Sequence, residues 1–374
     1  MKNNLSSKIK TNLGIIFKSK LLYVGILIRI VSLIVTLSLN KDLNDMNEVL
    51  ILAIQRLFNG QNPYENGYEY LLSVCEDECV VYNYHLGYPP VLLIIYSIVM
   101  IYPEMWGVWQ LNIVIFALNV IFDFLCVYLL FDKDKRLGNC IMGVYWSIPF
   151  FSYADYVTFY SLIYLLVFLT IYYIDQPLKS AFFMFLCIGS YHLMLLMLPA
   201  FIAYYFRSYT DREESVEIYK KRYDAHNNQK FTIKENFLAS IKINSLKNAF
   251  NRMMRDLKSN GWTIMKKICL GLLPTALIIL PFILWDPAGF KYHLLDANAD
   301  RYDLSNIKGY VFAIVGILIF WIIFSFIITL LIEKQYIAKI WVVSAVFITF
   351  IILSWYLLVS TDYEYPHYFG LILP

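Results

Sequence analysis

The chain has 374 residues, of which 59% are hydrophobic, 18% aromatic and only 16% charged. Soluble globular domains average about half apolar and about a quarter charged residues, so this composition argues against a soluble protein. The formal net charge of +3 does not indicate nucleic-acid binding, because the loop lysines of a membrane protein first set its orientation.

Residues 1–20 are predicted to form a cytoplasmic tail. They carry five lysines before an apolar run that is too long for the hydrophobic region of a cleaved signal peptide, and no small-residue cleavage site follows. The run itself, residues 21–39, approaches the roughly 20 residues that cross ~30 Å of hydrocarbon. We expect it to be the first membrane-spanning helix, leading outward.

The first outer loop, residues 40–102, is predicted to contain two interfacial helices. Residues 49–58 gather apolar side chains on one helical face, Gly60 ends that helix, and Asn62-Pro63-Tyr64 forms a turn. Tyr88-Pro89-Pro90 then opens a second helix with proline in its first positions. The apolar stretch that follows is too short to span a bilayer, so we place it at the interface.

Further apolar runs complete the predicted fold. Those long enough to span are residues 106–131, 264–284, 310–332 and 340–359, and shorter ones cover 137–151 and 157–174. Backbone polar groups in lipid must be paired internally, which requires helices. The predicted fold class is all-α, a polytopic transmembrane helical protein with about nine to ten spans.

Basic loops decide the sidedness of this arrangement. Residues 207–267 hold 14 Lys or Arg against 7 Asp or Glu, which places them in the cytoplasm. That placement requires residues 180–206, interrupted at Gly189–His192, to be a hairpin of two short helices. The predicted division is therefore a tail (1–20), an N-terminal transmembrane module (21–206) with its outer loop (40–102), a basic cytoplasmic loop (207–263) and C-terminal transmembrane helices (264–374).

The outer loop is acidic and contains two cysteines. Between residues 40 and 88 it has eight carboxylates against Lys41 and Arg56. Cys75 and Cys79 could form a disulfide if the loop faces an oxidising compartment. A metal site there is disfavoured, because Cys-x3-Cys lacks a second ligand pair. The run 76–78 (Glu-Asp-Glu) could recruit a divalent cation, but a solvated acidic turn is the favoured interpretation.

Asp45 stands at the beginning of the first interfacial helix, where the helix dipole favours a carboxylate. Taken alone, it is most simply an N-cap. In sequence order, however, it is followed by Gly60, Asn62-Pro63-Tyr64 and Tyr88-Pro89-Pro90. This combination resembles the glycosyltransferase C superfamily, integral membrane enzymes that use polyprenyl- or dolichyl-phosphate sugars, and within it the alpha-mannosyltransferase-like branch.

The resemblance extends over most of the chain but is specific only in the first outer loop. Residues 281–287 look like the family's span-to-loop junction, and His367-Tyr368 precedes the last helix as in the family. The lysine that the family has at a helix break is replaced here by Ser190-Tyr191-His192.

The resemblance implies a multi-pass glycosyltransferase of the cell membrane, with its active site on the non-cytoplasmic side. It would transfer a hexose, mannose being the family's choice, from a polyprenyl-phosphate donor to a lipid- or protein-linked glycan acceptor, without a required cofactor. An acceptor hydroxyl loses its proton as it attacks, so a carboxylate base must be near. Asp45 is the first choice for this base and Asp42 the second.

The leaving lipid phosphate needs cations or hydrogen-bond donors. Arg301 is the first choice because its fork fits phosphate oxygens. His192 is the second, as an ionisable residue at a helix break, although a hydrogen-bonded core histidine has equal weight. The further substrate-binding candidates are Tyr64, Tyr88 and His367, whereas Lys291, Lys308 and His293 are interpreted as solvated loop positions.

Two other function classes remain open. A transporter or lipid flippase usually concentrates polar residues near mid-membrane, but the predicted spans are nearly free of charge there, Asp123 being the main exception. A non-catalytic subunit of a glycan-assembly complex is the third hypothesis.

Overall fold

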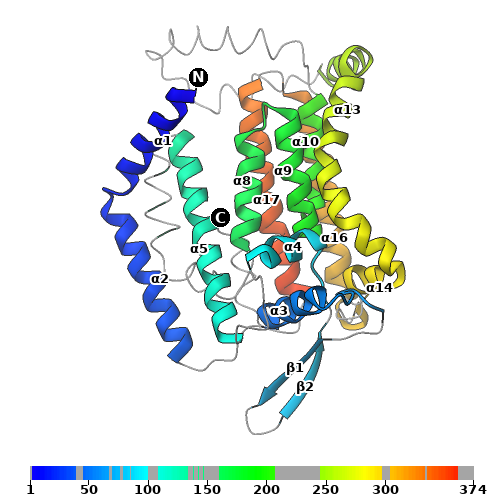
Figure 1. Ribbon diagram of the computed structural model, residues 1–374. Helices are drawn as coiled ribbons and strands as arrows, with labels where there is room; N and C mark the ends of the chain where they lie inside the picture. Colours follow the sequence, from blue (N-terminus) through cyan, green and yellow to red (C-terminus); the bar gives the residue numbers. More distant parts are fainter. Residues whose placement is uncertain are drawn as a thin grey trace.

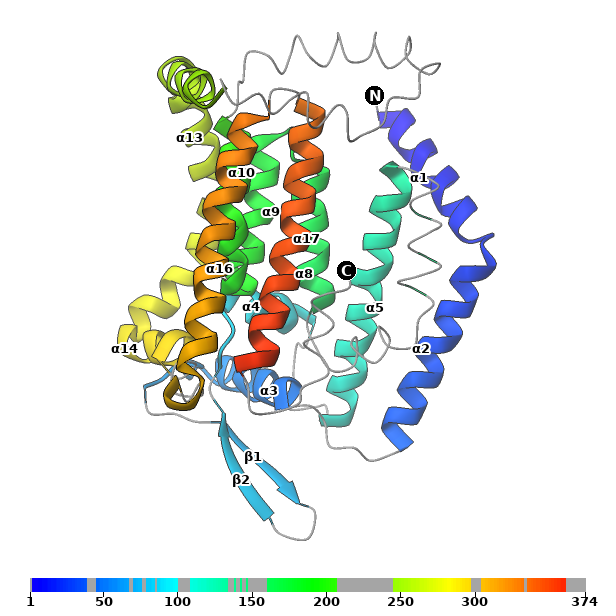
Figure 2. The same ribbon diagram turned by 180° about the vertical axis from the view of Figure 1, so that it is seen from behind.

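The structure is a computed structural model and it is mainly helical. It describes residues 2–38, 45–66, 70–75, 79–84, 86–99, 108–133, 138, 142, 146, 160–206, 245–296, 304–332 and 335–360. Figures 1 and 2 show long helices running side by side, with short helices and a β-hairpin gathered at one end. The start of α1 (Lys2–Ile16) and the first part of α13 (Ser245–Trp285) lie at the opposite end.

The long helices agree with the predicted apolar runs to within a few residues. They are α2 (Lys20–Ser38), α5 (Val108–Lys133), α8 (Tyr160–Tyr172), α16 (Leu304–Leu331) and α17 (Gln335–Ser360). The structure differs from the predicted extents in two places. The predicted tail, residues 1–20, contains helix α1, and α13 begins at Ser245, well before the predicted start at residue 264. The first half of α13 is polar. The prolines of this helix, Pro274 and Pro281, both lie in its second half, so no proline interrupts the polar half.

Two of the described helices are long and apolar enough to cross a membrane, Ile113–Asp132 within α5 and Gly261–Trp285 within α13. Their neighbours carry large apolar side chains on the outside as well: Leu27 of α2 is 61% exposed and Phe320 of α16 is 65% exposed. On α13 itself, Leu273, Leu277, Leu280 and Leu284 are exposed. Apolar surface of this extent marks contact with a membrane or a partner, which supports association with a membrane.

The predicted interruption between two short helices at Gly189–His192 is confirmed. α9 (Pro177–Ser190) ends before Tyr191, whose extended backbone (φ −149°, ψ 105°) separates it from η3 (His192–Met197) and α10 (Leu198–Phe206). Gly189 permits close packing just before the break. A Cβ there would lie 2.6 Å from Cγ2 of Val91 and 2.7 Å from Cγ2 of Thr275.

The all-α prediction is wrong in one element, a two-stranded antiparallel hairpin inside residues 40–102, the predicted first outer loop. Strand β1 (Tyr70–Cys75) pairs with β2 (Cys79–Tyr84), from Tyr70 opposite Tyr84 to Cys75 opposite Cys79. Strand β2 is rich in the β-branched and aromatic residues that favour strands, whereas β1 has only Tyr70 and Val74 of this kind. The hairpin points away from the helices (Figure 1), with its base next to α3.

A buried ion pair joins α2 to α5. Nη2 of Arg29 lies 2.9 Å from Oδ2 of Asp123, and the two side chains are 2% and 0% exposed. The guanidinium also stacks over the ring of Trp146 at 4.0 Å and donates to its carbonyl oxygen. Arg29 therefore neutralises the charge of Asp123, although in the sequence it is only a single charge within the apolar run 21–39.

Candidate functional site

The candidate site is built at the end of the helices that carries the β-hairpin. Helix α3 (Asp45–Phe58) and helix α4 (Pro90–Val99) lie across that end and contact each other (Figures 1 and 2). Leu50, Ala53 and Ile54 are fully buried, but Phe58 is 47% exposed and Arg56 is buried, so the predicted apolar face of residues 49–58 is confirmed only in part. Gly60, with φ +70°, takes the left-handed conformation that follows the helix.

Asp45 is the first residue of α3. This backbone position agrees with the predicted helix start, and the Asp45 side chain lies outside what the structure describes. The position does place a carboxylate-bearing residue where α3 begins, at the end of the helices that the short elements cover (Figure 1). The role of Asp45 as a base stays a prediction.

The Asn-Pro-Tyr turn is fixed by its own side chains. Oδ1 of Asn62 accepts a hydrogen bond from the backbone N–H of Tyr64 at 3.0 Å, which is the geometry that favours asparagine in turns. The Tyr64 hydroxyl donates to the carbonyl oxygen of Tyr88 at 2.6 Å. Two parts of the sequence motif, 24 residues apart, are thus held together directly.

Tyr64 is fully buried. Its ring meets Phe282 edge-on at 5.6 Å between centroids and lies 5.2 Å from the ring of Phe290. Because its hydroxyl is bonded within the protein, Tyr64 shapes the loop in this arrangement. Substrate binding by Tyr64 or Tyr88 stays a prediction.

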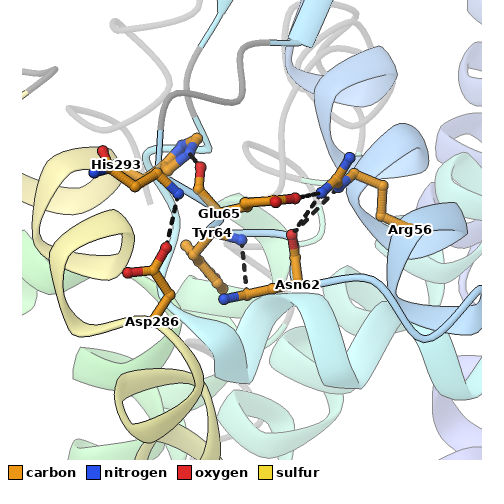
Figure 3. A network of polar contacts seen from close by, with 7 residues as sticks. Arg56, Asn62, Tyr64, Glu65, Asp286 and His293 are labelled. Atoms are coloured by element: carbon orange, nitrogen blue, oxygen red, sulfur yellow. Dashed lines mark hydrogen bonds and ion pairs between the residues drawn. The ribbon is translucent and has the colours of Figure 1, made fainter.

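Arg56 ties the end of α3 to the same turn (Figure 3). Its Nη2 donates to the carbonyl oxygen of Asn62 at 3.1 Å and pairs with the carboxylate of Glu65. Arg56 is almost buried while Glu65 is exposed. The single described cation of this loop is therefore bonded to the loop's own backbone and to an acid.

Asp286 joins the loop to the junction between α13 and α14 (Pro287–Lys291). Its Oδ1 accepts from the N–H of Gly289 at 2.9 Å, which caps α14, and its Oδ2 accepts from the N–H of Asn66 at 2.8 Å. These backbone hydrogen bonds to the charged form hold the pKa of Asp286 below its ordinary value. A Cβ on Gly289 would lie 2.0 Å from the carbonyl oxygen of Tyr64, so this close approach requires glycine.

His293, in η4 (Tyr292–Asp296), also joins the segment after α13 to the first loop (Figure 3). Its Nδ1 accepts from the N–H of Leu86 at 3.1 Å, and its Nε2 lies 3.1 Å from the carbonyl oxygen of Glu65. Nε2 must carry the proton in this pattern, because Nδ1 is an acceptor. The prediction that His293 is solvated is wrong, since the residue is fully buried.

The helix break lies beside this assembly through aromatic contacts. The ring of Tyr88 is 6.5 Å from that of Tyr191, which is in turn 5.9 Å from the ring of His192. Tyr160 packs edge-on against Tyr191 at 6.2 Å. Within the described residues, Nδ1 of His192 is buried and has no hydrogen-bond partner. Tyr64, Tyr88 and His192 are thus brought into one connected region.

The remaining predicted site residues, Asp42, Arg301 and His367, lie outside the described residues. Sequence analysis did not single out Asp286 or Glu65 as parts of the site, and it gave Arg56 no role. The junction 281–287 was the available signal for Asp286. Among the residues that the structure describes, no group of three His, Cys, Asp or Glu side chains could hold a metal ion.

Comparisons with protein-family models, with curated proteins and with solved structures found no match. The geometry of the site and the order of its motifs are therefore the basis for assigning a function.

Proposed function

We propose that this protein is a multi-pass membrane glycosyltransferase that moves a hexose, mannose in the first instance, from a polyprenyl-phosphate donor to a glycan or glycolipid acceptor. The observation that carries the proposal is the set of hydrogen bonds that holds the first loop, residues 62–66, in place. Asn62 accepts from the N–H of Tyr64, the Tyr64 hydroxyl donates to Tyr88, and the N–H of Asn66 donates to Asp286. These bonds fix the loop that follows α3, the helix that begins at Asp45.

A membrane location and its sidedness are part of this proposal. The exposed apolar side chains of α2, α13 and α16 would face lipid. Helix α1 carries the exposed Lys10, and the first part of α13 carries the exposed Arg255 and Lys258. The start of α1 and the first part of α13 lie at the end opposite the β-hairpin (Figure 1). Since basic residues favour the cytoplasmic side, the end with α3 and the hairpin would face outside. About nine to ten spans would cross the bilayer.

The proposed reaction is a single inverting displacement. The acceptor hydroxyl attacks the anomeric carbon, its proton passes to a carboxylate, and the bond from that carbon to the lipid-phosphate oxygen breaks. Asp45 is the proposed base because a donor held in the bilayer presents its sugar at the interface, where α3 would begin. Asp42, three residues earlier, is the second choice.

Stabilisation of the leaving phosphate is proposed for the helix break and the outer loops. His192 follows the extended residue Tyr191, and its Nδ1 is buried without a partner among the described residues. A buried polar atom in this state costs free energy unless a ligand or water bonds to it. A phosphate oxygen bonded to a protonated Nδ1 would satisfy it, with Arg301 supplying a second, forked donor.

The buried pair of Arg29 and Asp123 is the one observation that favours a transporter, because charges within membrane helices often mark transport paths. The two side chains are bonded to each other and are almost without exposed surface. The pair is therefore better explained as a fixed contact between α2 and α5 than as a transient ion site.

The test is turnover by the purified full chain in lipid. Release of polyprenyl phosphate from a polyprenyl-phosphate mannose should require an acceptor, and Asp45→Asn should abolish it without changing thermal unfolding. Asp175→Asn is the matched control. Asp175 accepts from Tyr204 and pairs with Lys339 away from α3, so this variant should keep turnover. Substrate flux into vesicles without transfer from any donor would instead support the transporter.

A further inference from the structure

The register of the β-hairpin brings two cysteines to the same position. Cys75, the last residue of β1, is paired directly with Cys79, the first residue of β2. Paired residues of antiparallel strands have Cα atoms about 4.5 or 5.5 Å apart. Both separations fall within the roughly 4.4–6.8 Å over which disulfides form, and side chains of paired residues leave the same face of the ribbon.

The hairpin is also an element that a covalent link would stabilise. A ribbon of two strands is at best marginally stable alone, and β1 and β2 pair only with each other. The ribbon extends away from the helices in both views (Figures 1 and 2). A bond at the end remote from α3 would fix the register of the two strands there.

The other described cysteines have a different setting. Cys126 and Cys187 are buried in α5 and α9, and Cys269 lies in α13, and none of these three is in a disulfide. Only the hairpin cysteines stand opposite each other in a strand pair among the residues that the structure describes.

We propose that Cys75 and Cys79 form an intramolecular disulfide that closes the tip of the hairpin in the mature protein. The inference rests on the proposed sidedness, because disulfides persist in compartments outside the cytoplasm. The oxidant is a disulfide of a thiol–disulfide oxidoreductase or of a small molecule. One cysteine thiolate attacks that disulfide and the second displaces the mixed disulfide, so the two hairpin thiols become one S–S bond and the donor becomes two thiols.

The experiment labels the full chain in intact cells. A membrane-impermeant maleimide is added outside without reductant, the protein is purified and denatured, remaining thiols are blocked with N-ethylmaleimide, and chymotryptic peptides are weighed. The peptide with both cysteines should carry neither label and be two hydrogens lighter than its dithiol form. After an impermeant phosphine has reduced the cells from outside, both cysteines should carry the impermeant label.

The Cys75→Ser variant is the matched control, because its remaining Cys79 thiol should be labelled from outside without reductant. Labelling of both cysteines in the unreduced wild-type protein would overturn the disulfide and leave the sidedness intact. Labelling of Cys79 in Cys75→Ser only after the cells are permeabilised would overturn the sidedness, and with it this inference. A disulfide between two chains, seen as a dimer on a non-reducing gel and lost in Cys75→Ser, would also overturn it.

Discussion

Removing one member of the Arg29–Asp123 pair should destabilise the protein far more than removing both. In Asp123→Leu, the Arg29 guanidinium stays buried with its charge unmatched, and in Arg29→Leu the Asp123 carboxylate does. Breaking a buried ion pair in this way costs about 3–5 kcal/mol. The double variant leaves no unmatched charge, so its cost should be about 1–2 kcal/mol, mainly for the lost stacking of Arg29 on Trp146.

These energies convert into measurable shifts in melting temperature. Unfolding entropy of about 2.1 cal/mol/K per residue, over 374 residues, corresponds to roughly 1.3 °C per kcal/mol. Each single variant should therefore melt about 4–6 °C below the parent protein in detergent, and the double variant only about 1–3 °C below it. Thermal unfolding followed by circular dichroism or by tryptophan fluorescence measures all three.

An exposed ion pair provides the control. Lys339 and Asp175 are 31% and 50% exposed, and such pairs contribute about 0–1 kcal/mol. Lys339→Met should therefore shift the melting temperature by about 1 °C or less. If the effects of Arg29→Leu and Asp123→Leu simply add in the double variant, the two residues are not coupled and the reasoning is refuted.

Three further predictions concern packing, pH and the turn. Gly25→Ala should destabilise the protein by about 1–3 kcal/mol, because its Cβ would lie 1.9 Å from the indole of Trp146. Gly14→Ala, whose Cβ would have nothing within 4 Å, should not destabilise it. Equal melting temperatures of the two variants would contradict this prediction. The pKa of Asp286 is lowered by folding, so its contribution to stability is complete above about pH 4 and is lost as the pH falls further. Protection of the Asn66 amide against hydrogen exchange, taken relative to the intrinsic rate at each pH, should fall over that range in the wild-type protein, and this fall should be absent in Asp286→Asn. Tyr64→Phe should cost about 1 kcal/mol through the lost bond to the Tyr88 carbonyl, and an unchanged melting temperature would contradict this.

Sequence alone predicted the helices well because length and apolarity decide them. The run 106–131 became α5 (Val108–Lys133), and the interruption at Gly189–His192 became a true break. The predicted apolar face of residues 49–58 is buried in part, because Leu50 and Ala53 are buried whereas Phe58 is exposed. In each case the signal lies within the segment itself.

The missed features depend on partners distant in sequence. Arg29 reads as an isolated charge in an apolar run, and only the fold shows that Asp123, 94 residues away, bonds to it. His293 lies in a polar stretch, yet its two ring nitrogens bond to the first loop, more than 200 residues earlier. The hairpin was overlooked because its strands are short and enclose a run of three acids.

The candidate site was predicted only in part for the same reason. The motif order singled out Tyr64 and Tyr88, and the two residues do meet. The hydrogen bonds of Asp286 to Asn66 and Gly289, which hold the motif against α13 and α14, require the three-dimensional arrangement.

The central claim is that a carboxylate at the beginning of α3 accepts a proton during sugar transfer. The most direct measurement is the pre-steady-state rate of polyprenyl-phosphate release by Asp45→Asn and by the wild-type chain in the same lipid, with both proteins melting at the same temperature. Loss of a general base should lower the rate by about 10²–10⁴-fold. A rate equal to that of the wild-type protein would contradict the claim.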